Sequence, residues 1–274
     1  MPMPRPPHWL VYSGGVALIL ALALWRQERA NAPEAPPPVP GEAQLPLAAN
    51  SPFAAKVAPL TPKVETMSGT AFSVAASGIW LTARHVIDGC RQPAIVVADG
   101  RGVAARIRGS ADDVAVLTTV GGSPALSVNA VSPLHRYQHG YLPGFPQGGP
   151  GEAASQLLGF QTLHKRERAT PPVATMAWAE VGRTDGLTGS LAGLSGAPVL
   201  DSGGQVVGVT LAEAPRRGRI YTSTPSAMGR ALKNAGVTLA PVSPGSAVSV
   251  DNYGRVADGL RRDLSVAQVV CLAT

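Results

Sequence analysis

Residues 193–199 read Gly-Leu-Ser-Gly-Ala-Pro-Val, and the interpretation of the whole chain begins with this turn. A serine that attacks a carbonyl carbon needs a tight turn that exposes its Oγ and aims backbone N–H groups at the oxygen that becomes negative. Glycines on both sides of Ser195 permit that close approach. Taken alone, however, the pattern is also typical of a glycine-rich turn between two strands, so the chemistry requires a base and an orienting acid elsewhere in the chain.

Two upstream segments hold a candidate base and a candidate acid. His85 lies in the run Thr-Ala-Arg-His-Val at residues 82–86, and Asp113 begins the run Asp-Val-Ala-Val-Leu at residues 113–117. With the serine turn behind them, the motifs stand in the order His, Asp, Ser, which differs from the order in subtilisin-like and α/β-hydrolase enzymes. Together they resemble the trypsin/chymotrypsin family of serine proteases, in particular its bacterial HtrA-type branch, over roughly residues 63–228.

That resemblance implies a serine endopeptidase that hydrolyses peptide bonds through an acyl-enzyme on Ser195 and needs no cofactor. His85 would act as general base and then as general acid, and Asp113 would orient its ring and stabilise the imidazolium. Asp113 is preferred over Asp112 because the acid of the family directly precedes an apolar strand. The oxyanion donors would be the backbone N–H groups of Gly193 and Ser195. The alternative function is that of a catalytically silent domain of the same fold that binds protein partners.

The walls of the primary specificity pocket also follow from the resemblance. One wall would come from the segment before the serine, a second from the strand after it and a third from residues 218–221. The first wall carries no acid, so small or apolar residues, rather than Lys or Arg, are expected before the scissile bond. Glu213 and Arg219 leave open whether they pair, narrow the pocket or face solvent, with solvent favoured for Arg219. The predicted substrate-binding residues are Thr188, Gly189, Leu211, Ala212 and Glu213.

Composition favours an all-β fold. The 274 residues include 31 glycines and 26 prolines, and only 15% are charged, which favours many turns between short strands over a helical bundle. The expected strands form two sets, as the two six-stranded antiparallel β-barrels of the chymotrypsin-like fold require. The first set covers residues 68–74, 78–82, 94–98 and 114–117, and the second covers 157–160, 176–179, 197–200 and 205–209.

We expect the protease domain to span residues 63–228 and a short, partly helical tail to follow at 229–274. Ser226 is a candidate N-cap for a helix over residues 227–234. Residues 266–272 fit either a last strand or the end of a second helix. The tail is too short for the PDZ domain that many HtrA-type proteases carry, so the oligomeric state is left open.

The N-terminal part divides into a flank at residues 1–8, an apolar helix at 9–25 and a proline-rich linker at 26–62. The apolar segment has no charged side chain, a tryptophan at each end and arginines outside it. Its length is short for a membrane-spanning helix, but the aromatic ends suit an interfacial anchor. We therefore expect a single-pass anchor in the bacterial inner membrane and, as the family implies, a catalytic domain in the periplasm. A cleaved signal peptide and a secreted enzyme are the alternative.

The remaining candidates concern redox chemistry, metals and partners. Outside the cytoplasm, Cys90 and Cys271 could form a disulfide that ties the tail to the first barrel; unpaired thiols are the alternative. His135 and His139 have a helical ligand spacing, but the segment lacks the internal Glu of a metalloprotease motif and is rich in turn residues, so no metal site is expected. The net charge of +6 is scattered, which favours no nucleic-acid surface. The expected partners are protein or peptide substrates and the membrane.

Overall fold

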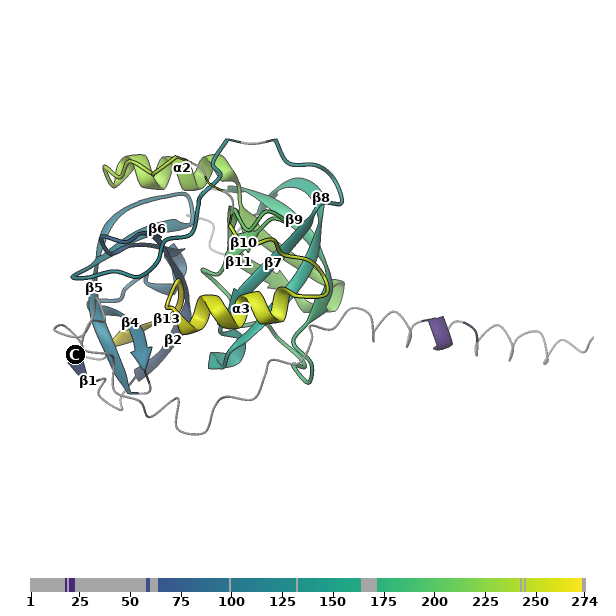
Figure 1. The fold of residues 1–274 in the computed structure, drawn as a ribbon, viewed down its shortest axis with the longest axis horizontal. Coiled ribbons are helices and arrows are strands. Elements are labelled where there is room, and N and C mark those ends of the chain that lie inside the picture. The colour runs from purple at the N-terminus through teal and green to yellow at the C-terminus, as the bar shows by residue number, and fades with distance from the viewer. Residues whose placement is uncertain are drawn as a thin grey trace, which may run out of the picture.

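The computed structural model describes residues 18, 20–22, 58–59, 64–98, 100–131, 133–163, 172–241, 243 and 245–272. Within this part of the chain, two antiparallel β-barrels lie side by side, the first drawn mainly in blue and the second in teal and green (Figure 1). The expected all-β architecture of two six-stranded barrels is confirmed.

The first barrel draws its strands from opposite ends of the described chain. Short apolar runs bounded by glycine-containing turns form most of it, as the sequence predicts. The short β1 (Ala58–Pro59) pairs with β5 outside the ring. Around the ring, the strands are β2 (Val64–Ala75), β3 (Ile79–Ala83), β6 (Val114–Thr119), β5 (Arg101–Ala111), β4 (Pro93–Ala98) and β13 (Val266–Leu272).

The strand β13 closes the first barrel from the C-terminal tail. It lies between β2 and β4, with Val266 opposite Phe72 and Val269 opposite Ile95. Both valines are fully buried, and β-branched side chains fit a pleated, buried strand better than a helix. Of the two interpretations left open for residues 266–272, the strand is therefore the one that the structure shows.

The second barrel is closed by strands from the middle of the chain. Its core packs around Trp178, whose indole Nε1 donates to Thr222 Oγ1 at 2.8 Å. His139, one of the two spaced histidines, begins a strand of this barrel and stacks on Tyr141, with the ring centroids 6.0 Å apart. Around the ring, the strands are β7 (His139–Gly144), β8 (Gly151–Leu163), β9 (Val173–Arg183), β12 (Arg219–Ser223), β11 (Val206–Ala214) and β10 (Pro198–Leu200).

Two α-helices lie on the surface of the barrels. α2 (Pro225–Asn234) begins earlier than predicted, and its N-cap is Thr224 instead of Ser226. The Thr224 hydroxyl accepts from Ala227 N–H at 3.2 Å, and a proline at the first helical position suits this start because it has no N–H to satisfy. The other helical elements within residues 64–272, as far as the structure describes them, are α3 (Tyr253–Arg262) and the 3-10 turns η2 (Arg84–Val86), η3 (Pro146–Gly148) and η4 (Pro215–Arg217).

A disulfide fastens the last strand to the segment that follows η2. Cys90 and Cys271 are joined by an S–S bond of 2.06 Å, with their Cα atoms 5.6 Å apart. The bridge therefore ties the C-terminal strand to the loop that begins a few residues after His85.

The predicted apolar helix at 9–25 falls outside the described residues except for Leu18 and residues 20–22, and the linker at 26–62 does so except for residues 58–59. In the part of the chain that the structure describes, no helix has the length and apolar character needed to cross a bilayer.

Candidate active site

His85 and Asp113 meet where β3 ends and β6 begins. The two strands are antiparallel, with Ala83 opposite Val114, so Arg84, which follows β3, pairs with Asp113, which precedes β6, and His85 comes next in the short turn η2. The His85 N–H donates to Asp113 Oδ1 at 3.1 Å, and His85 Nδ1 lies 3.0 Å from Asp113 Oδ2. The carboxylate side chain is 4% exposed and the imidazole 34%. This pairing holds the ring proton on Nδ1 and leaves Nε2 available to a second partner.

The neighbouring carboxylate points to a different element. Asp112 has a left-handed φ of +52°, and its Oδ2 lies 2.6 Å from Nη2 of Arg230 on α2. Of the two adjacent acids, Asp113 is the one that contacts the candidate base.

The backbone of the serine turn lies against β2 of the first barrel. The Thr70 N–H donates to the Ser195 carbonyl at 2.8 Å. Gly196 has a φ of +90°, and a Cβ there would lie 2.0 Å from the Thr70 carbonyl oxygen, so no other residue fits. A Cβ on Gly69 would lie 2.7 Å from Val86 Cγ1 and 2.8 Å from the Ser195 carbonyl oxygen. Gly69 therefore lies between the backbone of Ser195 and the side chain of Val86, the residue that follows His85.

The peptide before the serine is oriented by the loop after β7. The Gln147 N–H donates to the Ala192 carbonyl at 2.5 Å. Because the C=O and N–H of a trans peptide point in opposite directions, the Gly193 N–H points away from this loop. Gly193 has a φ of +97°, and a Cβ there would lie 2.4 Å from the Phe145 carbonyl oxygen. Among the described residues, neither the Gly193 N–H nor the Ser195 N–H has an acceptor, so both are available to an oxyanion.

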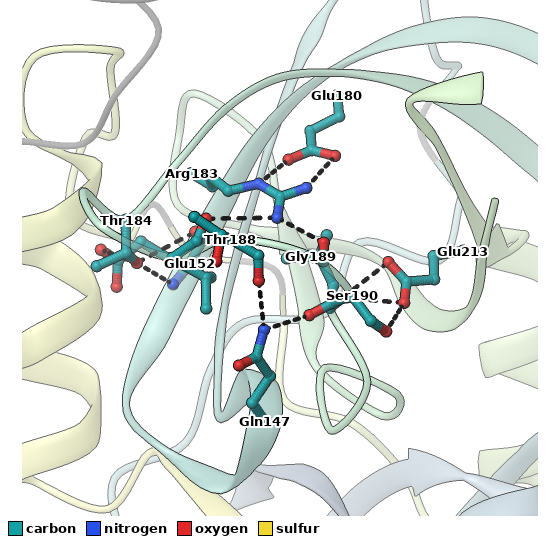
Figure 2. A network of polar contacts seen from close by, with 11 residues as sticks. Gln147, Glu152, Glu180, Arg183, Thr184, Thr188, Gly189, Ser190 and Glu213 are labelled. Carbon is teal, nitrogen blue, oxygen red and sulfur yellow. Dashed lines mark hydrogen bonds and ion pairs between the residues drawn. The ribbon is translucent and has the colours of Figure 1, made fainter. Parts of the chain in front are cut away.

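Side-chain donors hold the predicted first wall of the pocket (Figure 2). Each of the four successive carbonyl oxygens of residues 187–190 accepts a hydrogen bond. Arg183 Nη1 donates to the first and third at 3.5 and 2.9 Å, and Gln147 Nε2 donates to the second and fourth at 2.6 and 2.8 Å. Arg183 is itself fixed by two contacts to the Glu180 carboxylate, at 2.5 and 2.8 Å. The wall is thus held in one conformation by charge-assisted and neutral hydrogen bonds.

Glu213 connects the second wall to the first. From β11 its carboxylate accepts from the Ser190 hydroxyl and from the Leu191 N–H, the latter at 2.9 and 2.8 Å (Figure 2). Arg219 instead donates to two backbone carbonyls of the turn before it, at 3.1 and 3.2 Å. Glu213 and Arg219 therefore do not pair. The Glu213 side chain spans the space between the two predicted walls.

Sequence reasoning missed the residues that support the serine turn. Besides Gln147 and Arg183, Thr70 has this role, because its hydroxyl donates to the Gly193 carbonyl at 2.9 Å and accepts from the Phe145 N–H at 3.1 Å. Thr70 looks like an ordinary strand residue in the sequence. The only sequence signal near Gln147 is the run of glycine and proline around it, which predicts a turn but not its contacts.

Comparison with known families agrees with this geometry. Residues 69–209 match the family model of the trypsin-like peptidase domain. The chain belongs to this family. The family assignment makes it a serine-type endopeptidase by class, and the resemblance inferred from the three sequence motifs is confirmed. A comparison with curated proteins finds no match.

The solved structures that this chain resembles are distant in sequence. The active form of the Rv3671c protease from M. tuberculosis is 21% identical, with a TM-score of 0.53, and the match covers 91% of this chain and 99% of that one. The MamO protease domain from Magnetospirillum magneticum is 15% identical, with a TM-score of 0.50 and coverage of 64% and 93%. An HtrA-type protease, AlgW with a decapeptide, is 22% identical, with a TM-score of 0.45 and coverage of 57% and 47%.

Proposed function

We propose that this peptidase hydrolyses peptide bonds through an acyl-enzyme on Ser195, with His85 as the base and Asp113 as the orienting acid. The observation that carries the proposal is the paired His85–Asp113 contact beside a serine turn whose two backbone donors have no acceptor among the described residues. Ser195 Oγ attacks the scissile carbonyl while His85 Nε2 takes its proton, and the same proton then passes to the leaving amine. Water then attacks the acyl carbonyl while His85 Nε2 takes its proton, and that proton passes to Ser195 Oγ as the ester bond breaks and the acid product leaves.

The charge that develops on the carbonyl oxygen would be stabilised by the Gly193 and Ser195 N–H groups. Such donors are fixed before the reaction, so no reorganisation is needed in the transition state, and one donor contributes about a hundred-fold or more to kcat. The buried Asp113 carboxylate stabilises the imidazolium that forms on His85.

Labelling with a fluorophosphonate probe tests the assignment. The probe phosphonylates a serine only where a base and an oxyanion hole activate it, so the folded parent should label and Ser195→Ala should not. A folded parent that does not label, but still binds unfolded protein segments, would favour the silent, partner-binding domain instead.

We further propose that small residues are preferred before the scissile bond. Glu213 reaches across the pocket to Ser190 and Leu191, which leaves less room for a large side chain. Both carboxylate oxygens accept from the Leu191 N–H, which holds the Glu213 side chain against the first wall. Cleavage of a peptide library, read by mass spectrometry, tests this preference. Predominant cleavage after Lys, Arg or large aromatic residues would contradict it.

A membrane location outside the cytoplasm is the third part of the proposal. The apolar segment at residues 9–25 and the proline-rich residues 26–62 suit an anchor and a spacer in the bacterial inner membrane. The Cys90–Cys271 bridge suits an oxidising compartment such as the periplasm. Fractionation of the full chain followed by N-terminal sequencing tests this, because an intact N-terminus in the membrane fraction supports the anchor, whereas a cleaved soluble form supports secretion.

A further inference from the structure

The C-terminal helix α3 brings a buried charged cluster to the second barrel. α3, drawn in yellow, contacts β7 and β8 as well as β13 (Figure 1). The side chain of its Arg261 is 9% exposed, and Nη2 lies 2.9 Å from Glu152 Oε2 and 2.5 Å from Asp258 Oδ1. Nη1 donates to the carbonyl of Gly151 at 3.0 Å and approaches that of Gly144 at 3.5 Å. Gly144 and Gly151 are paired where β7 and β8 meet, so one side chain of the tail holds the base of this hairpin.

The loop at residues 145–150, which this hairpin base carries, supports the serine turn. Its Gln147 donates from the backbone to Ala192 and from the side chain to the pocket wall. Gln147 has a φ of +55°, a left-handed conformation that is unfavourable for a residue with a side chain and persists only where surrounding contacts impose it. The Ala192–Gly193 peptide and the pocket wall therefore depend on one loop, and contacts from other parts of the protein must hold that loop in its conformation.

Glu152 extends the same cluster to the start of the pocket wall. Its Oε1 accepts from Thr184 Oγ1 at 2.9 Å, and the Thr184 N–H donates to the Glu152 carbonyl at 3.0 Å (Figure 2). Thr184 opens the turn that leads into residues 187–190. Burial raises the pKa of Glu152, and the Arg261 guanidinium together with the Thr184 hydroxyl offsets part of that rise, so Arg261 favours the charged form of a carboxylate that burial disfavours.

We propose that Arg261 is a positioning residue of the active site, which holds the loop at 145–150 and thereby the orientation of the Ala192–Gly193 peptide. The inference rests on the proposed function. α3 lies outside residues 69–209, the part that matches the family model. Arg261 does not touch substrate in this account; it acts through the hairpin base and Gln147.

The substitution Arg261→Lys tests the inference. Lysine keeps the charge, but its compact ammonium cannot reach both carboxylates and the Gly151 carbonyl at once. We expect kcat to fall about ten-fold or more with KM changed less than about three-fold. The reason is that a misplaced Gly193 N–H stabilises the transition state less well but hardly changes the binding of the substrate. The matched control is Arg255→Lys, the same change at an exposed position of the same helix, which should leave both constants at the parent values.

Three outcomes would overturn the inference. They are a folded Arg261→Lys enzyme with the parent kcat, a rise in KM alone, and equal losses in the two lysine variants. If Arg261→Lys does not fold, the triple variant Glu152→Gln/Asp258→Asn/Arg261→Met removes all three charges of the cluster together and should show the same loss of kcat. A triple variant with the parent kcat would also overturn it.

Hydrogen exchange separates this inference from the proposed function. In a Ser195→Ala background, Arg261→Lys should speed exchange in peptides that cover residues 145–150 and 190–196, whereas Arg255→Lys should not. This readout needs no catalysis, so a parent that fails to label with fluorophosphonate would refute the proposed function without altering the exchange result. Unchanged exchange in both segments would overturn the inference even if the parent is fully active.

Discussion

Adjacent aspartates before β6 provide a matched test of the candidate triad at the scale of single residues. Asp113 contacts His85, while Asp112 pairs with Arg230 on the surface. Asp113→Asn should lower kcat by about 10⁴, because the amide stabilises the wrong tautomer of the imidazole.

Asp112→Asn should leave kcat unchanged, since it alters only an exposed ion pair and Asn tolerates the left-handed φ of that position. Steady-state kinetics on one peptide substrate measures both variants. A large loss for Asp112→Asn with little loss for Asp113→Asn would reverse the assignment.

Two substitutions of Glu213 distinguish the effect of its size on the pocket from the effect of its charge. Glu213→Ala should open the space between the walls, so that the kcat/KM ratio for Leu over Ala before the scissile bond rises about ten-fold or more. Glu213→Gln keeps the size of the side chain and should keep the preference for small residues. Matched peptide pairs that differ at this one position provide the measurement. Equal selectivity in the two variants would mean that Glu213 does not limit the pocket.

At the scale of elements, β13 is required for the first barrel. A chain that ends at Asp263 would leave the edges of β2 and β4 unpaired and would remove the buried Val266 and Val269. Exposed edges of this kind promote association. We therefore expect loss of the cooperative thermal transition and aggregation on size-exclusion chromatography.

The control for this truncation ends at Leu272 and keeps all of β13. It should melt like the parent, since the removed residues 273–274 lie after the strand. A chain ending at Asp263 that still melts cooperatively and labels at Ser195 would contradict the role given to β13.

At the scale of the whole molecule, the pH dependence of stability reflects the buried cluster. Burial raises the pKa of Glu152 above the ordinary 4.5, so between the two values the folded protein holds a proton that the unfolded chain has lost. The contribution of Glu152 to stability is therefore present below pH 4.5 and is lost as pH rises through the folded pKa. The melting temperature of the parent minus that of Glu152→Gln should increase as pH falls from 7 toward 4.5.

The exposed Asp88→Asn variant serves as the baseline for losing one carboxylate. Melting curves of the three proteins in one buffer series provide the comparison. A difference between parent and Glu152→Gln that stays constant, or decreases, as pH falls would contradict the raised pKa of Glu152.

Both barrels and the tail contribute to the site, and this limited what could be predicted. The strands around His85 and Asp113 were predictable because each is a short apolar run with a turn beside it. Thr70 and Arg261 were not, since their partners Gly193 and Glu152 lie 123 and 109 residues away in the chain. No local pattern carries information about such contacts.

By itself, the sequence determined the family and the three candidate catalytic residues, because a serine turn and the runs around His85 and Asp113 are local patterns that the chemistry requires. Only the tertiary structure decided that residues 266–272 form a strand, that Glu213 contacts the first wall of the pocket, and that Arg261 contacts the base of the hairpin beside the serine turn. Each of these depends on how segments distant in the chain pack together, and packing of that kind follows from the folded core rather than from the periodicity of any one segment.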